Sequence, residues 1–138
     1  MAEVFAGFVV GYGLALALAP AGALLLIRSN DRTGLAQRLA PPGTSVIALS
    51  VVLHFAAIIA LTAVGLVLGM ALGGIEDRRP DGGLGSPNVA YTSIVVALAA
   101  AVFVPALALP AVRRAAVAAG LVFAAAFGWA MPWLATLG

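Results

Sequence analysis

A single histidine is the main candidate for chemistry in this chain. Apart from the phenol of Tyr12, His54 is the only ionisable side chain deep inside an uncharged stretch. An ionisable residue at membrane depth is a functional hypothesis, because imidazole can ligate haem iron, relay a proton or hydrogen-bond a quinone. The chain holds no second histidine for a bis-histidine haem. His54 is therefore interpreted either as a haem or quinone contact, or as a neutral histidine bonded to a backbone carbonyl or to Ser50, one turn earlier. No other cofactor is predicted.

The remaining groups that could do chemistry are few. The chain has no cysteine, which excludes thiolate metal sites and cysteine nucleophiles. No paired carboxylates, metal-ligand cluster or Ser/His/Asp arrangement falls at membrane depth. The Gly82–Gly85 turn lacks the Lys-Ser/Thr pair of a phosphate loop. We expect no catalytic residue and no metal site, and whether the chain takes part in an enzyme is left open.

Long uncharged stretches determine the fold class. Hydrophobic residues make up 64% of the 138 residues and charged residues 9%, against about 25% charged in soluble domains. A helix needs about 20 apolar residues to cross a bilayer, and four stretches are long enough. The sequence predicts an all-α, polytopic integral membrane protein, one four-helix transmembrane domain over residues 1–138 with short loops. The expected helices cover approximately residues 4–27, 44–72, 89–112 and 115–137.

The arginines predict the orientation in the membrane. Short cytoplasmic loops are rich in Arg. The first and third expected loops hold Arg28, Arg32, Arg38, Arg113 and Arg114, and the second loop holds only two, at positions 78 and 79. We therefore predict a multi-pass protein of the cytoplasmic (inner) cell membrane, with both termini on the non-cytoplasmic side. No basic run exceeds two residues, so no nucleic-acid partner is expected.

Aromatic side chains agree with this orientation. Phe5, Phe8, Tyr91, Trp129 and Trp133 fall near the membrane face that carries the termini. Aromatic rings often anchor membrane helices at the level of the lipid headgroups. We therefore expect these five rings to lie at the interface between the membrane and water.

Glycines spaced four residues apart predict where helices meet. Small residues at this spacing let helix backbones approach closely, which is how helices associate in lipid. The expected helix-packing residues are Gly7, Gly11, Gly65, Gly69, Gly73, Gly120 and Gly128. Two interpretations stay open: packing within this bundle, and packing against other membrane-protein subunits. The prolines inside the stretches predict kinks used in packing.

Three functions fit these features. The first is a non-catalytic structural or accessory subunit of a larger membrane complex, energy-transducing complexes included, since the chain has few polar groups and several small-residue faces. The second is a small oligomeric transporter or channel. The third is a redox subunit that contacts haem or quinone through His54. The transporter would use a sparse polar lining of Tyr12, His54, Tyr91, Thr92 and Ser93.

Overall fold

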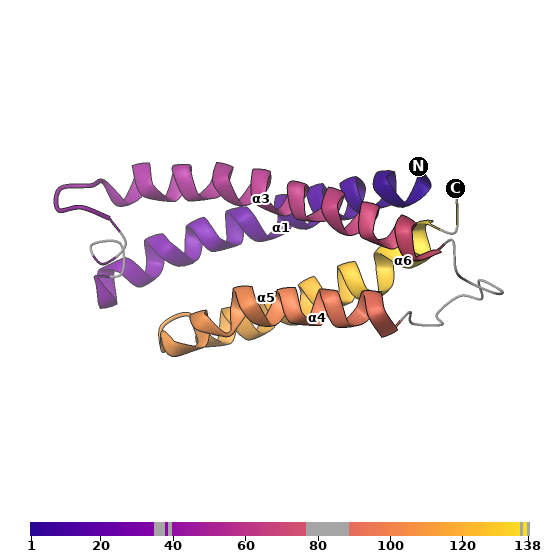
Figure 1. Ribbon diagram of the computed structural model, residues 1–138. Helices are drawn as coiled ribbons and strands as arrows, with labels where there is room; N and C mark the ends of the chain where they lie inside the picture. The colour runs from indigo at the N-terminus through magenta and orange to yellow at the C-terminus, as the bar shows by residue number, and fades with distance from the viewer. Residues whose placement is uncertain (35–37, 39, 77–88, 136, 138) are drawn as a thin grey trace.

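The protein is a bundle of four membrane-spanning segments (Figure 1). The computed structural model describes residues 1–34, 38, 40–76, 89–135 and 137. No strand occurs among these residues, and four segments are long and apolar enough to cross a bilayer. These spans are Ala2–Asn30, Val46–Gly74, Val89–Ala108 and Arg113–Ala135. The predicted all-α four-helix fold is confirmed, and the chain is a multi-pass membrane protein.

The first two spans form a long hairpin of α1 (Ala2–Thr33) and α3 (Val46–Glu76) (Figure 1). Both helices continue past the C-terminal ends of the predicted ranges, and α3 begins two residues later than predicted. Helix α1 continues through Pro20 and ends at Gly34, whose left-handed backbone (φ 60°) lets its amide bond the Asn30 carbonyl at 2.9 Å. Gly34 thus closes the helix with little strain, because glycine has no Cβ. Residues 35–37 and 39 of the first predicted loop and residues 77–88 of the second lie outside the described residues.

The second hairpin is less regular. The predicted third helix, 89–112, is α-helical only over α4 (Val89–Phe103) and continues as the 3₁₀ turn η1 (Pro105–Ala108). Pro105 and Pro110 have no amide hydrogen to continue an α-helix. The amides of Leu107 and Leu109 instead bond carbonyls three residues back, at 3.0 and 3.1 Å. Arg113 Nε donates to the Leu107 carbonyl at 3.1 Å, which closes the turn before the next helix.

The fourth span contains three helical pieces. Helix α5 (Arg113–Ala125) passes into the π-helical turn η2 (Ala126–Ala130) and then into α6 (Met131–Ala135). Gly120 lies against Phe103, and Gly128 lies against Val95. Since residue numbers rise in one helix as they fall in the other, this span is antiparallel to α4, as the short connection predicts.

The two hairpins meet at the end that carries the termini and separate toward the other end (Figure 1). The main buried cluster takes side chains from all four spans. It consists of Ala6, Leu14, Leu68, Leu72, Tyr91, Val95, Phe123, Phe127, Met131 and Ala135. At the opposite end, a second cluster holds only Leu26, packed by Val46 and Leu49 of the same hairpin. The buried core that joins the two hairpins therefore lies at the end of the bundle that carries the N- and C-termini.

Candidate functional site

The most specific polar contact in the core joins α4 to the π turn. The hydroxyl of Tyr91 donates to the backbone carbonyl of Phe127 at 2.8 Å and lies 3.7 Å from the sulfur of Met131. Tyr91 is 1% exposed and Phe127 is 0% exposed. A buried carbonyl that lacks a donor is costly. The Tyr91 hydroxyl therefore supplies the donor that the buried Phe127 carbonyl of the fourth span requires.

Pro132 explains why no amide of its own helix bonds the Phe127 carbonyl. In the π turn, the amide of Met131 bonds the carbonyl of Ala126, five residues back, so it does not serve Phe127. The next amide along the helix would be that of residue 132, and proline has none. The Phe127 carbonyl is left without a helical donor, and Tyr91 fills the vacancy from another span.

Sequence reasoning missed this pair and placed Tyr91 at the membrane interface with Phe5, Phe8, Trp129 and Trp133. That assignment is wrong for Tyr91, whose ring and hydroxyl are buried. Phe5 and Trp129 are each 69% exposed, as rings at a lipid surface are. The usable signal in the sequence was Pro132, because a proline inside a helix always leaves one upstream carbonyl in need of a donor.

Glycines of α1 and α3 form the closest helix contact. A Cβ added to Gly7 would meet the carbonyl of Gly65, and one added to Gly11 would lie 2.6 Å from the carbonyl of Leu61. A Cβ on Gly69 would lie 2.5 Å from the carbonyl of Glu3. All of these neighbours are backbone atoms, which cannot swing aside. The two helices therefore cross at a spacing that only glycine permits at these positions.

The other predicted packing glycines have ordinary contacts. A Cβ on Gly73 would meet the side chain of Glu3 at 3.7 Å, and one on Gly120 would meet the Phe103 side chain at 3.5 Å. For Gly128 the nearest atom is the Val95 Cγ1 at 3.9 Å. Each could hold a methyl group without displacing a neighbour. Gly22, which continues the spacing of Gly7 and Gly11, has no neighbour within 4 Å.

His54 lies half-buried on α3, on the face that continues from buried Ser50 toward Gly65. Its imidazole packs edge-on against the ring of Phe55, with centroids 5.5 Å apart. Ser50 donates to the carbonyl of Ile47 at 2.8 Å, so this hydroxyl hydrogen is used within its own helix. Within the described residues, no hydrogen bond is recorded for His54, and no group of three His, Cys, Asp or Glu side chains lies close enough to hold a metal.

The side chains considered for a polar path do not converge. Tyr12 is 43% exposed on α1, where its ring stacks on Phe8 with centroids 5.9 Å apart. Tyr91 is buried against Phe127, whereas Ser93 is exposed and donates to the carbonyl of Val89 at 2.7 Å. Thr92 and Ser93 line one groove along α4, whereas Tyr12, His54 and Tyr91 lie in other surroundings, so the structure does not bring the five groups together.

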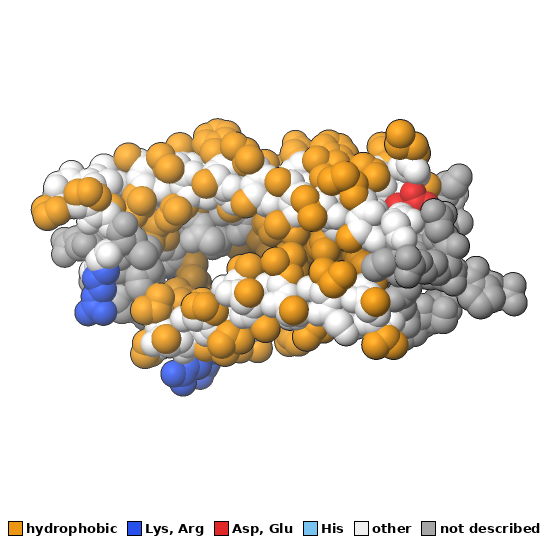
Figure 2. Space-filling view, in the orientation of Figure 1, with side chains coloured by type: hydrophobic (Ala, Val, Ile, Leu, Met, Phe, Trp, Pro, Cys, Tyr) orange, Lys and Arg blue, Asp and Glu red, His pale blue; other side chains and the backbone are white. Residues whose placement is uncertain are grey.

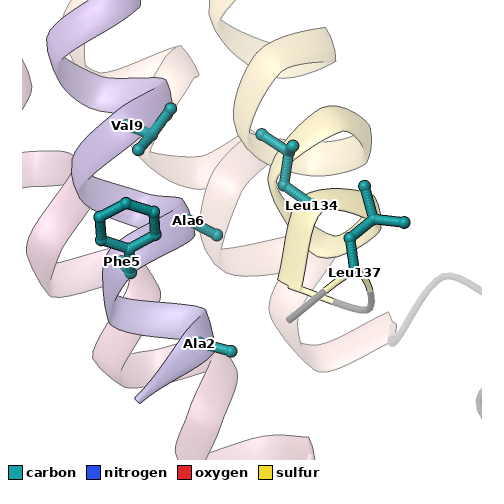
Figure 3. Close-up of a pocket in the computed structure, with 6 residues that line it drawn as sticks. All are labelled: Ala2, Phe5, Ala6, Val9, Leu134 and Leu137. Atoms are coloured by element: carbon teal, nitrogen blue, oxygen red, sulfur yellow. The ribbon is translucent and has the colours of Figure 1, made fainter.

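An apolar pocket lies between the two ends of the chain (Figure 3). It has a volume of about 270 Å³. Helix α1 supplies Ala2, Phe5, Ala6 and Val9, and the C-terminal segment supplies Leu134 and Leu137. Figure 3 shows Ala6 and Leu134 facing one another across it. The described residues that line this pocket carry only hydrocarbon side chains, and none of them could take part in acid–base or metal chemistry.

Comparison with protein-family models, curated proteins and solved structures finds no match for this chain. Its function must therefore be argued from the geometry of its own residues.

Proposed function

We propose that the chain is a non-catalytic subunit of a larger membrane complex, held by helix packing. One observation carries the proposal: three hydroxyl groups in the spans bond to backbone carbonyls of this chain. Ser50 bonds Ile47, Tyr91 bonds Phe127 and Ser93 bonds Val89. Polar groups used in this way stabilise helices and their packing, and they are not free to replace the hydration of a solute.

An open face of α4 supports a role in assembly. A shallow groove of about 450 Å³ runs along this face. It is lined by Val89, Thr92, Ser93, Val96, Ala97 and Ala100. Ser93, Ala97 and Ala100 are exposed and small, and small residues let a second helix approach closely in lipid. This is the face on which we expect a helix of another subunit to pack.

The alternatives draw less support. A transporter or channel needs polar groups around one path, whereas Tyr12, His54 and Ser93 lie in separate surroundings. A redox subunit needs a ligand set around His54, and a partner would have to supply it. Both alternatives depend on polar side chains, whereas the proposed subunit depends on helix faces that pack against other subunits.

Bulky substitution on the α4 face tests the proposal. Ala97→Trp adds an indole to the groove, and Ala63→Trp adds the same group to an exposed position of α3 as the matched control. We expect both variants to insert and to keep the wild-type melting temperature. Ala97→Trp should lose the polypeptides that co-purify with the wild type in mild detergent, and Ala63→Trp should keep them. Equal recovery with both variants, or a wild type that purifies alone, contradicts the proposal.

A further inference from the structure

Arginines gather at the end of the bundle where the hairpins separate. Arg28 and Arg38 belong to the first hairpin, and Arg113 and Arg114 belong to the second. All four side chains are exposed. Figure 2 shows positive charge on both hairpins at this end and the described negative charge at the other. Among the described side chains, the recorded ion pair joins Met1 to Glu3 and involves none of these arginines.

Arg28 and Arg113 lie at similar distances from the buried core at the terminal end. Arg28 follows Ala6 in α1 by the same number of residues as Arg113 precedes Ala135, and Ala6 and Ala135 share the buried core. At 1.5 Å per residue, each arginine lies about 33 Å from that layer. The hydrocarbon region of a bilayer is about 30 Å thick. Both hairpins therefore present guanidinium groups at the headgroup level of one leaflet.

A recess lies between the two hairpins at the end that carries the arginines. Figure 2 shows hydrophobic side chains of the second hairpin along one side of it and positive charge on both hairpins nearby. The buried cluster nearest this end, around Leu26, includes no residue of the second hairpin. An acyl chain fits the apolar recess, and an anionic headgroup complements the arginines.

We propose that this arginine end binds anionic phospholipid, with the headgroup phosphate held by the guanidinium groups and an acyl chain in the recess between the hairpins. Arg113 uses Nε on the Leu107 carbonyl, which orients its guanidinium and leaves the terminal nitrogens for a phosphate. Arg114 has no recorded partner among the described residues. Guanidinium groups match phosphate oxygens in a bidentate geometry. The inference concerns lipid alone and stands independently of the proposed function.

Lipid retention in native mass spectrometry tests this inference. Purified protein is equilibrated with vesicles of phosphatidylglycerol and phosphatidylcholine in equal amounts. We expect the wild type to retain phosphatidylglycerol preferentially, and R113Q/R114Q to lose roughly 10- to 30-fold in apparent affinity. R78Q/R79Q, which removes the same charge from the second loop, should keep the wild-type preference. Equal retention of the two lipids, or equal loss in both double variants, overturns the inference.

Two further experiments complete this test: single substitutions and competition with inorganic phosphate. Arg114→Gln alone removes charge without breaking a recorded hydrogen bond, so we expect it to fold normally and still weaken phosphatidylglycerol retention. Unchanged retention in a normally folded Arg114→Gln and in Arg28→Gln contradicts the inference. Inorganic phosphate at millimolar concentration distinguishes lipid from a free anion. We expect it to leave the bound lipid in place, and complete displacement would show an anion site in place of a lipid site.

Discussion

Tyr91 and Phe127 form a hydrogen bond between two transmembrane spans that a proline in one of them makes necessary. The Tyr91 hydroxyl donates at 2.8 Å to a carbonyl 36 residues along the chain. Met131 bonds the Ala126 carbonyl, and Pro132 has no amide hydrogen, so neither serves Phe127. A break in one helix is thus repaired by a side chain of its neighbour, and the pair fixes how α4 sits against the π turn.

Removing the Tyr91 hydroxyl should destabilise the bundle. Tyr91→Phe keeps the ring in its buried place but leaves the Phe127 carbonyl without a donor. We expect the free energy of unfolding to fall by about 1–2 kcal/mol. Reversible unfolding in detergent micelles, followed by circular dichroism, measures this loss.

Pro132→Ala provides the second half of that test. The alanine restores an amide that can bond upstream carbonyls, so the Tyr91 hydroxyl becomes less important. We expect Tyr91→Phe to cost clearly less in the Pro132→Ala background than in the wild type. The same cost in both backgrounds would mean that the hydroxyl and the proline act independently, which contradicts the account of this pair.

The crossing of α1 and α3 should be intolerant of any side chain. In Gly65→Ala, the new Cβ would meet the Gly7 carbonyl and lie 2.9 Å from the Gly11 Cα. Both are backbone atoms, so the helices must move apart, at a cost of about 1–3 kcal/mol. Gly74→Ala is the control on the same helix, because Gly74 has no neighbour within 4 Å. Equal melting temperatures for the two variants would refute a contact limited to glycine.

The sequence predicts the spans well but not which side of each helix faces inward. Length and lack of charge are enough to locate the four spans in a chain dissolved in lipid. In water, an apolar face would mark the interior, but in lipid both faces are apolar. This is why the sequence places Tyr91 at the interface and predicts Gly65 and Gly120 alike as packing residues. Only the three-dimensional arrangement separates the ordinary contact of Gly120 from the tight contact of Gly65.

The prolines that interrupt the helices show the same difference between what the sequence predicts and what it does not. Pro105 and Pro110 mark a region where an α-helix cannot continue, and α4 ends just before the first of them. The consequence of Pro132 depends on a residue of another span, because the donor that replaces its missing amide is the Tyr91 hydroxyl. Effects within one helix can thus be predicted from sequence, and effects that depend on pairing cannot.

His54→Gln should leave the protein and its assembly intact. His54 is half-buried, and its recorded contact is with the ring of Phe55. Glutamine keeps a polar side chain that can hydrogen-bond at this position. We expect a change below about 1 kcal/mol in the free energy of unfolding, measured by thermal unfolding, and unchanged activity of any assembled complex. Loss of a haem spectrum or of quinone-linked turnover would favour the cofactor interpretation.

Cysteine labelling should locate the termini outside the cytoplasm. The chain has no native cysteine, so single cysteines give a clean signal. The excess of arginine near Asn30 predicts that this end is cytoplasmic. In intact cells, an impermeant maleimide should label Leu137→Cys and leave Asn30→Cys unlabelled until the membrane is opened. The opposite pattern would reverse the orientation.

The most direct test of the proposed function is native mass analysis of the wild-type protein taken from its source membrane in mild detergent. The helix faces left open in this structure, above all the groove on α4, predict one assembly in which this chain is present with other polypeptides in a fixed ratio. Recovery of monomers or simple homodimers that also transport a solute in reconstituted vesicles would contradict the subunit proposal and support the transporter.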